Sequence, residues 1–252
     1  MKNTFANQFL IMKKLLLMLS LAICVNAVLA QDTKPASGKK DWSKVNLGNR
    51  AADHFMISFG YLGWAGRPDT INTKGFSRTF NAALLFDFPF KTNPHLSAAI
   101  GLGVGTDNMF FEHTTINLIN RQQIQFNADT ANKYKKYKLA TGYIEAPVEL
   151  RFASNPENMN TGFKFALGVK VGALLDAHTK AKVDLDTDGF GGYVTKDKDK
   201  KFFNGTRFSG TARIGYGHFS VFGTYQINNF FKDGVGPAGI HPYSIGLTLS
   251  GL

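Results

Sequence analysis

The feature that most constrains the fold is an alternation of side-chain types with a period of two residues. In the stretch FKFALGVKVGALL, residues 163–175, large apolar side chains alternate with small residues and two lysines, Lys164 and Lys170. Successive side chains of a strand point to opposite faces. The stretch therefore predicts a strand with one bulky apolar face and one face of small and charged residues.

Seven other stretches show the same alternation: residues 54–64, 79–90, 96–105, 143–152, 208–216, 218–227 and 243–250. Their lengths are close to the roughly 9–11 residues of a tilted membrane-spanning strand. The connections are short at 91–95, 153–162 and Gly217, and long near 65–78, 106–142, 176–207 and 228–242. We predict an all-β fold, an eight-stranded antiparallel up-and-down transmembrane β-barrel with short periplasmic turns and long outer loops.

Two kinds of barrel show this alternation, and they differ in which face points inward. A soluble ligand-binding barrel places apolar side chains inside, whereas a transmembrane barrel places them outside, against lipid. The second face here is rich in Gly, Ala and Ser, which suits the narrow interior of an eight-stranded barrel. A lysine facing lipid near the midplane would cost about 2–4 kcal/mol. We therefore expect the small and charged face to line the lumen, with a soluble periplasmic ligand-binding β-barrel as an alternative.

The predicted inward face carries three acidic and four basic residues: Asp87, Glu145, Glu149, Arg151, Lys164, Lys170 and Arg213. An isolated buried charge is costly, so these side chains are expected to pair with one another. We predict a nearly neutral charge network that fills the lumen. The alternative function for the same residues is a narrow channel or transport path.

The outward face carries aromatic residues near both ends of the strands. Those beside the short turns are Phe55, Phe88, Phe90, Phe152, Phe163, Tyr216 and Phe219. Those toward the long loops are Tyr61, Phe80, Phe208, Tyr225 and Tyr243. Aromatic girdles at both membrane boundaries are typical of outer-membrane barrels.

The N-terminal segment has the layout of a secretory signal peptide, with basic residues before an apolar run that ends at Val28-Leu29-Ala30. We predict a signal peptide at 1–30, a flexible periplasmic leader at 31–52 and the barrel at 53–252. The only cysteine, Cys24, lies within the signal peptide. A mature chain without cysteine has no thiolate metal site and no disulfide framework, and we expect no cofactor.

The formal net charge is +11, but the lysines gather in particular segments, which argues against a nucleic-acid partner. Two runs lie in predicted outer loops: Lys133, Lys135, Lys136 and Lys138, and then Lys196, Lys198, Lys200 and Lys201. Such runs are ordinarily solvated loops, and the alternative is attraction to the phosphates of lipopolysaccharide. The expected surroundings are outer-membrane lipid and lipopolysaccharide in a Gram-negative envelope.

Three local patterns leave alternatives open. Asp184, Asp186 and Asp188 match the first half of a calcium loop, but the twelfth position is Thr195 instead of the bidentate Glu; a hairpin turn at Asp188-Gly189 is the alternative. Residues 114–126 could add a hairpin and make a ten-stranded barrel. No Gly-x-Ser-x-Gly element is present, and we predict no enzymatic activity.

The stretch YKLATGYIEAPVELRF, residues 137–152, resembles the central segment of the PorT-like family of small bacterial outer-membrane β-barrels through Tyr143, Ile144, Glu145, Ala146 and Pro147. The C-terminal strand YSIGLTLSGL is similar to a barrel assembly signal but ends in Gly251-Leu252. The resemblance implies an integral outer-membrane protein, with some relatives linked to protein secretion. We expect a filled barrel with mobile outer loops and a structural or interaction role, through its loops or an envelope or secretion-machinery partner.

Overall fold

The computed structural model of the chain describes residues 50, 53–118, 122–129, 134, 136–182 and 193–251. All of them belong to one compact unit, Trp42–Leu252. Among these residues no helix is long and apolar enough to cross a membrane.

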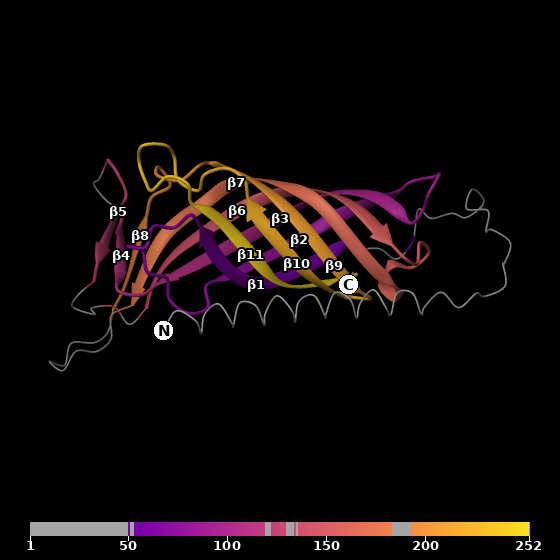
Figure 1. Cartoon of the computed structure of the whole chain (residues 1–252), viewed down its shortest axis with the longest axis horizontal. Coiled ribbons are helices and arrows are strands. Elements are labelled where there is room, and N and C mark those ends of the chain that lie inside the picture. The colour runs from indigo at the N-terminus through magenta and orange to yellow at the C-terminus, as the bar shows by residue number, and fades with distance from the viewer. Residues whose placement is uncertain are drawn as a thin grey trace, which may run out of the picture. The chain divides into compact units, whose positions relative to one another are not determined.

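Eight long strands form the body of this unit: β1 (Phe55–Ala65), β2 (Arg78–Pro89), β3 (Leu96–Phe111), β6 (Lys136–Ala153), β7 (Phe163–Lys182), β9 (Thr206–Tyr216), β10 (Phe219–Gln226) and β11 (His241–Ser250). Each pairs antiparallel with the next, β11 pairs with β1, and the sheet closes on itself (Figure 1). The prediction of an eight-stranded up-and-down barrel is confirmed.

Three shorter strands lie at the end of the barrel that carries the long loops (Figure 1). β4 (Thr114–Asn117) and β5 (Gln125–Ala128) form a separate two-stranded sheet, and β8 (Val194–Lys198) pairs with the last residues of β7. The hairpin considered at 114–126 therefore exists, but the ten-stranded alternative is wrong because β4 and β5 do not join the barrel. Asp184, Asp186 and Asp188 lie outside the described residues.

We call this end the long-loop end and the opposite end the short-turn end. At the short-turn end, β6 and β7 are joined by a segment that contains the 3-10 helix η2 (Met159–Thr161), whose N-cap is Asn158. β9 and β10 are joined by the two-residue turn Gly217-His218, in which Gly217 has a φ of 60°. Glycine adopts that left-handed conformation without steric cost, which permits so tight a turn.

The alternation along the strands has the predicted polarity. Leu167, Val169 and Ile245 are 50%, 52% and 57% exposed on the outer surface, whereas Lys164 is buried in the lumen. The small residues on the inward face allow close packing: a Cβ added to Gly168 would lie 2.3 Å from the carbonyl oxygen of Val148. An apolar outer belt and a polar lumen are the arrangement expected against lipid.

β7 contains one irregularity, where its register against β6 shifts between Gly142 and Tyr143. Tyr143 pairs with Leu174 and Gly142 with Asp176, so Leu175 is an extra residue, a β-bulge. A one-residue shift exchanges the two faces of a strand. Beyond the bulge, Ala177 and Ala181 face inward and are buried.

The main hydrophobic core lies at the long-loop end. This loop-end core consists of Leu62, Trp64, Ile71, Met109, Phe111, Ile116, Leu118, Ile124, Tyr137, Leu139, Ala177, Ala181, Phe202, Phe203, Phe230, Phe231 and Ile240. The ring of Trp64 lies 5.2 Å from that of Phe230 and 5.6 Å from that of Phe111. The Tyr137 hydroxyl donates to the Ile116 carbonyl at 2.6 Å. The described parts of the long loops pack together over the barrel.

Candidate functional site

Seven charged residues form a cluster inside the barrel near the short-turn end. This short-turn cluster consists of Arg50, Asp53, Asp87, Glu149, Arg151, Lys164 and Arg213. Arg213 of β9 holds Asp53 and Glu149, with Nη1 2.6 Å from Oδ2 of Asp53 and Nη2 3.0 Å from Oε2 of Glu149. Lys164 donates to the other Asp53 oxygen at 2.6 Å.

Arg151 and Arg50 complete this cluster. Arg151 Nε donates to Glu149 Oε2 at 2.8 Å, and its Nη1 lies 3.7 Å from Asp87 Oδ1. Arg50 donates to Asp87 Oδ2 at 2.6 Å and to the carbonyl oxygens of Pro94 and Pro156. Each carboxylate in the short-turn cluster therefore contacts two cations, which offsets the cost of burying it.

Asp53 precedes β1 at the mouth of the barrel, and its ionisation shows the effect of these contacts. Burial opposes ionisation, but the charges of Arg213 and Lys164 and the hydrogen bonds that they donate outweigh it and lower the pKa of Asp53 from 3.8 to about 2. The carboxylate is therefore held ionised at neutral pH.

A second group of ions, the mid-lumen cluster, consists of Asp107, Glu145, Lys170 and Arg207. Arg207 of β9 donates to Asp107 Oδ2 at 2.5 Å and also to Glu145, and its guanidinium lies 3.8 Å from the centre of the Tyr143 ring. Lys170 donates to Glu145 Oε2 at 3.1 Å. Two acids and two bases make this cluster neutral.

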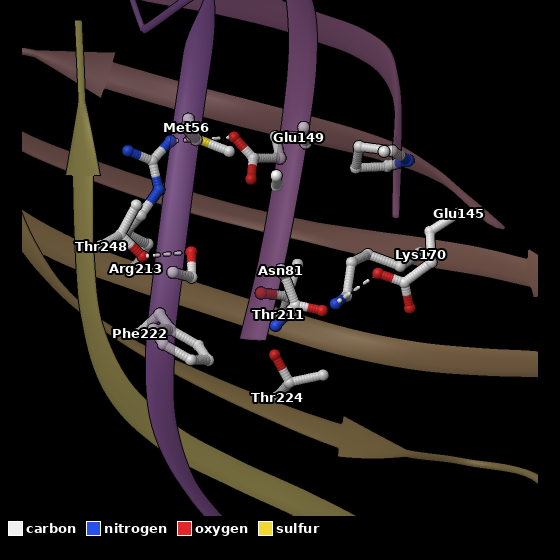
Figure 2. A pocket seen from close by; sticks show the side chains of 15 residues that line it. Met56, Asn81, Glu145, Glu149, Lys170, Thr211, Arg213, Phe222, Thr224 and Thr248 are labelled. Atoms are coloured by element: carbon white, nitrogen blue, oxygen red, sulfur yellow. Dashed lines mark hydrogen bonds and ion pairs between the residues drawn. The ribbon is translucent and has the colours of Figure 1, made fainter. Parts of the chain in front are cut away.

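A small cavity separates the two clusters. Figure 2 shows Lys170 reaching toward Glu145 on one side of it, with Arg213 and Glu149 on the other. Its volume is about 50 Å³, room for about three or four water molecules. Phe222, an inward aromatic residue that interrupts the alternation of β10, is buried against it. The space is too small for a drug-sized ligand, whose pockets measure roughly 300–1,000 Å³.

All seven residues that the sequence predicts for the lumen network lie in these two clusters. Four further members are Arg50, Asp53, Asp107 and Arg207. Asp107 and Arg207 lie on the inward phase of β3 and β9, just beyond the ends predicted for those strands. Both would have been predicted if the strand at 96–105 had been extended by two residues and the strand at 208–216 by one. Arg50 lies in the segment expected to be a flexible leader, where no periodic pattern marks it.

The outward face carries the predicted aromatic residues. Beside the short turns, Tyr216 and Phe219 are 69% and 68% exposed. Toward the long-loop end, Tyr61, Phe80, Phe208 and Tyr225 are also exposed. Among the residues that the structure describes, no group of three or more His, Asp, Glu or Cys side chains is arranged to hold a metal ion.

Comparison with known proteins agrees with this geometry. A family model described as outer membrane protein beta-barrel domain matches residues 30–242. The chain belongs to this family. No curated protein and no solved structure matches it. Membership of the outer-membrane barrel family implies an integral outer-membrane protein, with the short-turn end in the periplasm. The alternative of a soluble periplasmic ligand-binding barrel is wrong, since its apolar face would point inward.

Proposed function

We propose that this outer-membrane barrel is closed to solutes and has a structural or interaction role, without enzymatic activity. The observation that carries the proposal is the double closure of the lumen. Two clusters of paired ions fill the barrel, and the loop-end core covers it at the outer end. A hydrated ion would have to break several buried ion pairs and then cross an apolar core.

The loops support an interaction role. The described loops and the β4–β5 sheet form a packed body with its own core, which presents a defined surface outside the barrel. The PorT-like resemblance points to a protein of the envelope, with secretion machinery as the first class of partner to test. Three residues of the resembling stretch, Tyr143, Glu145 and Pro147, face the lumen, where Glu145 and Tyr143 contact Arg207.

The experiment for closure is conductance of the purified full-length protein in planar bilayers. We expect no unitary current steps from preparations whose folded state is confirmed by heat-modifiable migration in gels. Discrete, reproducible steps from wild-type protein would contradict closure.

The experiment for the interaction role is site-specific photo-crosslinking in intact cells. A photoreactive residue at Tyr193, exposed at the long-loop end, is expected to capture a defined envelope protein. A matched probe at Leu167, which is 50% exposed like Tyr193 but lies on the lipid-facing belt, is expected to capture lipid only. Identical protein adducts from both positions, or none from Tyr193, would contradict the proposal.

The second candidate is a narrow conduction path, and one observation favours it. A second cavity of about 20 Å³ shares Asn81, Lys170 and Thr224 with the first, so Lys170 lies between two small polar spaces. A displaced Lys170 would join them. The same conductance measurement separates the two candidates. If the barrel is closed, Lys170→Ala is expected to show no current; if it conducts ions, Lys170→Ala is expected to conduct more current than wild type.

A further inference from the structure

Four cations lie close together on the outward face at the long-loop end. They are Arg78 of β2, Lys138 of β6, Lys180 of β7 and Lys196 of β8, and we call them the basic row. Lys138 pairs directly across the strands with Lys180, and Lys180 with Lys196. Arg78 and Lys138 both lie over the ring of Phe110, at 5.1 and 5.9 Å from its centre. Lys136 and Lys182, the next outward pair, repeat the arrangement.

The basic row has no carboxylate partner among the described residues. Like charges directly opposite one another on neighbouring strands are destabilising. In the described part of the chain, none of the four cations forms an ion pair. The nearest outward carboxylate along β7, Asp176, is already held by His178 at 2.5 Å and Lys198 at 2.6 Å. An anion from outside the chain would relieve the repulsion within the row.

The basic row lies where the outward face changes from apolar to polar. On β2, Phe80 occupies the next outward position, about 7 Å from Arg78. On β3 and β6, only small or uncharged residues separate the apolar belt from the row: Thr106, Asn108, Ala140 and Gly142. This position, beyond the apolar belt, is where lipid headgroups would meet the barrel.

The bulge in β7 is what brings Lys180 into the basic row. If the strand alternated regularly through Leu175, the outward phase set by Val169 and Val171 would continue to Ala177 and Thr179, and Lys180 would point inward. The bulge therefore serves both faces: it turns the alanines into the loop-end core and the lysines toward the membrane surface.

We propose that the basic row binds the phosphate groups of lipopolysaccharide in the outer leaflet. Arginine and lysine side chains donate charge-assisted hydrogen bonds to phosphate oxygens. Phosphates of neighbouring lipid molecules repel one another, and the row supplies the positive charge that otherwise comes from divalent cations. This inference does not depend on whether the barrel conducts.

The test is the affinity of the purified full-length protein for lipopolysaccharide, measured in detergent by a titration of bound lipid. The variant Lys138→Gln, Lys180→Gln, Lys196→Gln is expected to bind about a hundredfold more weakly, because each basic residue near an anionic lipid surface contributes roughly fivefold. The control variant Lys74→Gln, Lys91→Gln, Lys232→Gln removes the same charge from exposed positions elsewhere and is expected to bind like wild type.

Two further binding measurements identify the chemical group that is bound. Lipopolysaccharide treated to remove its phosphates is expected to lose the same affinity with wild-type protein, and inorganic phosphate at millimolar concentration is expected not to displace the intact lipid. Both triple variants are checked for folding by heat-modifiable migration. Equal binding by wild type and the basic-row variant, an equal loss in the control variant, or undiminished binding of the dephosphorylated lipid would overturn the proposal.

Discussion

The lipid-facing part of the barrel and its long-loop end are built from the same strands. Apolar side chains face outward in the first region and inward in the second. Along β6, Glu149 and Glu145 face the lumen while Val148 and Ile144 face outward. Further along the same strand, Leu139 and Tyr137 face inward and are buried, while Lys138 and Lys136 face outward. β7 makes the same change, from lumenal Lys164 and Lys170 to buried Ala177 and Ala181.

The difference shows that the medium outside the sheet decides what can lie inside it. Where lipid covers the outer face, large apolar residues face out, and the narrow interior is filled by small residues and paired ions. Beyond the hydrocarbon, where polar headgroups and water cover the sheet, the lysines face out and the interior becomes a conventional hydrophobic core. The level at which the polarity reverses therefore marks the outer boundary of the membrane on the protein itself.

The largest expected effect comes from breaking the short-turn cluster. Arg213→Met leaves Asp53 and Glu149 with one cation each, and loss of one partner of a buried ion pair costs about 3–5 kcal/mol. We expect the free energy of unfolding in urea, from lipid vesicles, to fall by that amount. Lys91→Met, which removes an exposed cation from a short turn, is the control and is expected to change it by less than about 0.5 kcal/mol. Equal effects of the two substitutions would show that the paired ions do not hold the lumen together.

A substitution in the loop-end core should act locally. Trp64→Ala removes a ring packed against Phe111, Phe230 and Phe231, at a cost of about 3–5 kcal/mol to that core. We expect faster hydrogen exchange at 227–240 while the strands of the lipid-facing belt keep their protection. Trp64→Phe is the control, with a smaller increase confined to the same segment. A uniform increase over the whole barrel would mean that the two regions unfold as one unit.

Acid should weaken the short-turn cluster and spare the loop-end core. Because the pKa of Asp53 is lowered from 3.8 to about 2, its contribution is complete above pH 4 and is lost as the pH falls through about 2. That contribution is on the order of 2 kcal/mol. We expect unfolding experiments between pH 5 and 2 to show this loss in wild type and a flatter profile in Asp53→Asn. Parallel profiles would contradict the assignment.

The sequence predicts the barrel better than it predicts what lies at its outer end. The alternation predicts the eight strands and the direction of side chains such as Lys164 and Lys170. Successive side chains of a strand face lipid and lumen in turn, and the two environments require different residue types. The same pattern stops being recognisable near Asp107 and Arg207, because the polarity reverses just beyond them. The predicted strands therefore end too early, and both residues are missing from the predicted network.

The loop-end core has no comparable sequence signal. Phe203, Phe230 and Ile124 meet there from three separate loops, and no period relates their positions. The bulge at Leu175 is equally hidden, since it is defined by its pairing with β6. Arg50 reaches Asp87 from outside any strand. Such contacts follow from closure of the barrel, which brings distant segments together, and not from local pattern.

The most direct test of the polarity reversal compares two valines that are equally exposed, Val169 on the lipid-facing belt of β7 at 52% and Val194 on β8 at 53%. Each is replaced by Arg, and the free energy of folding into lipid vesicles is measured. The account predicts that Val169→Arg costs about 2–4 kcal/mol and Val194→Arg no more than about 1 kcal/mol. Equal costs at the two positions, or a larger cost at Val194, would contradict it.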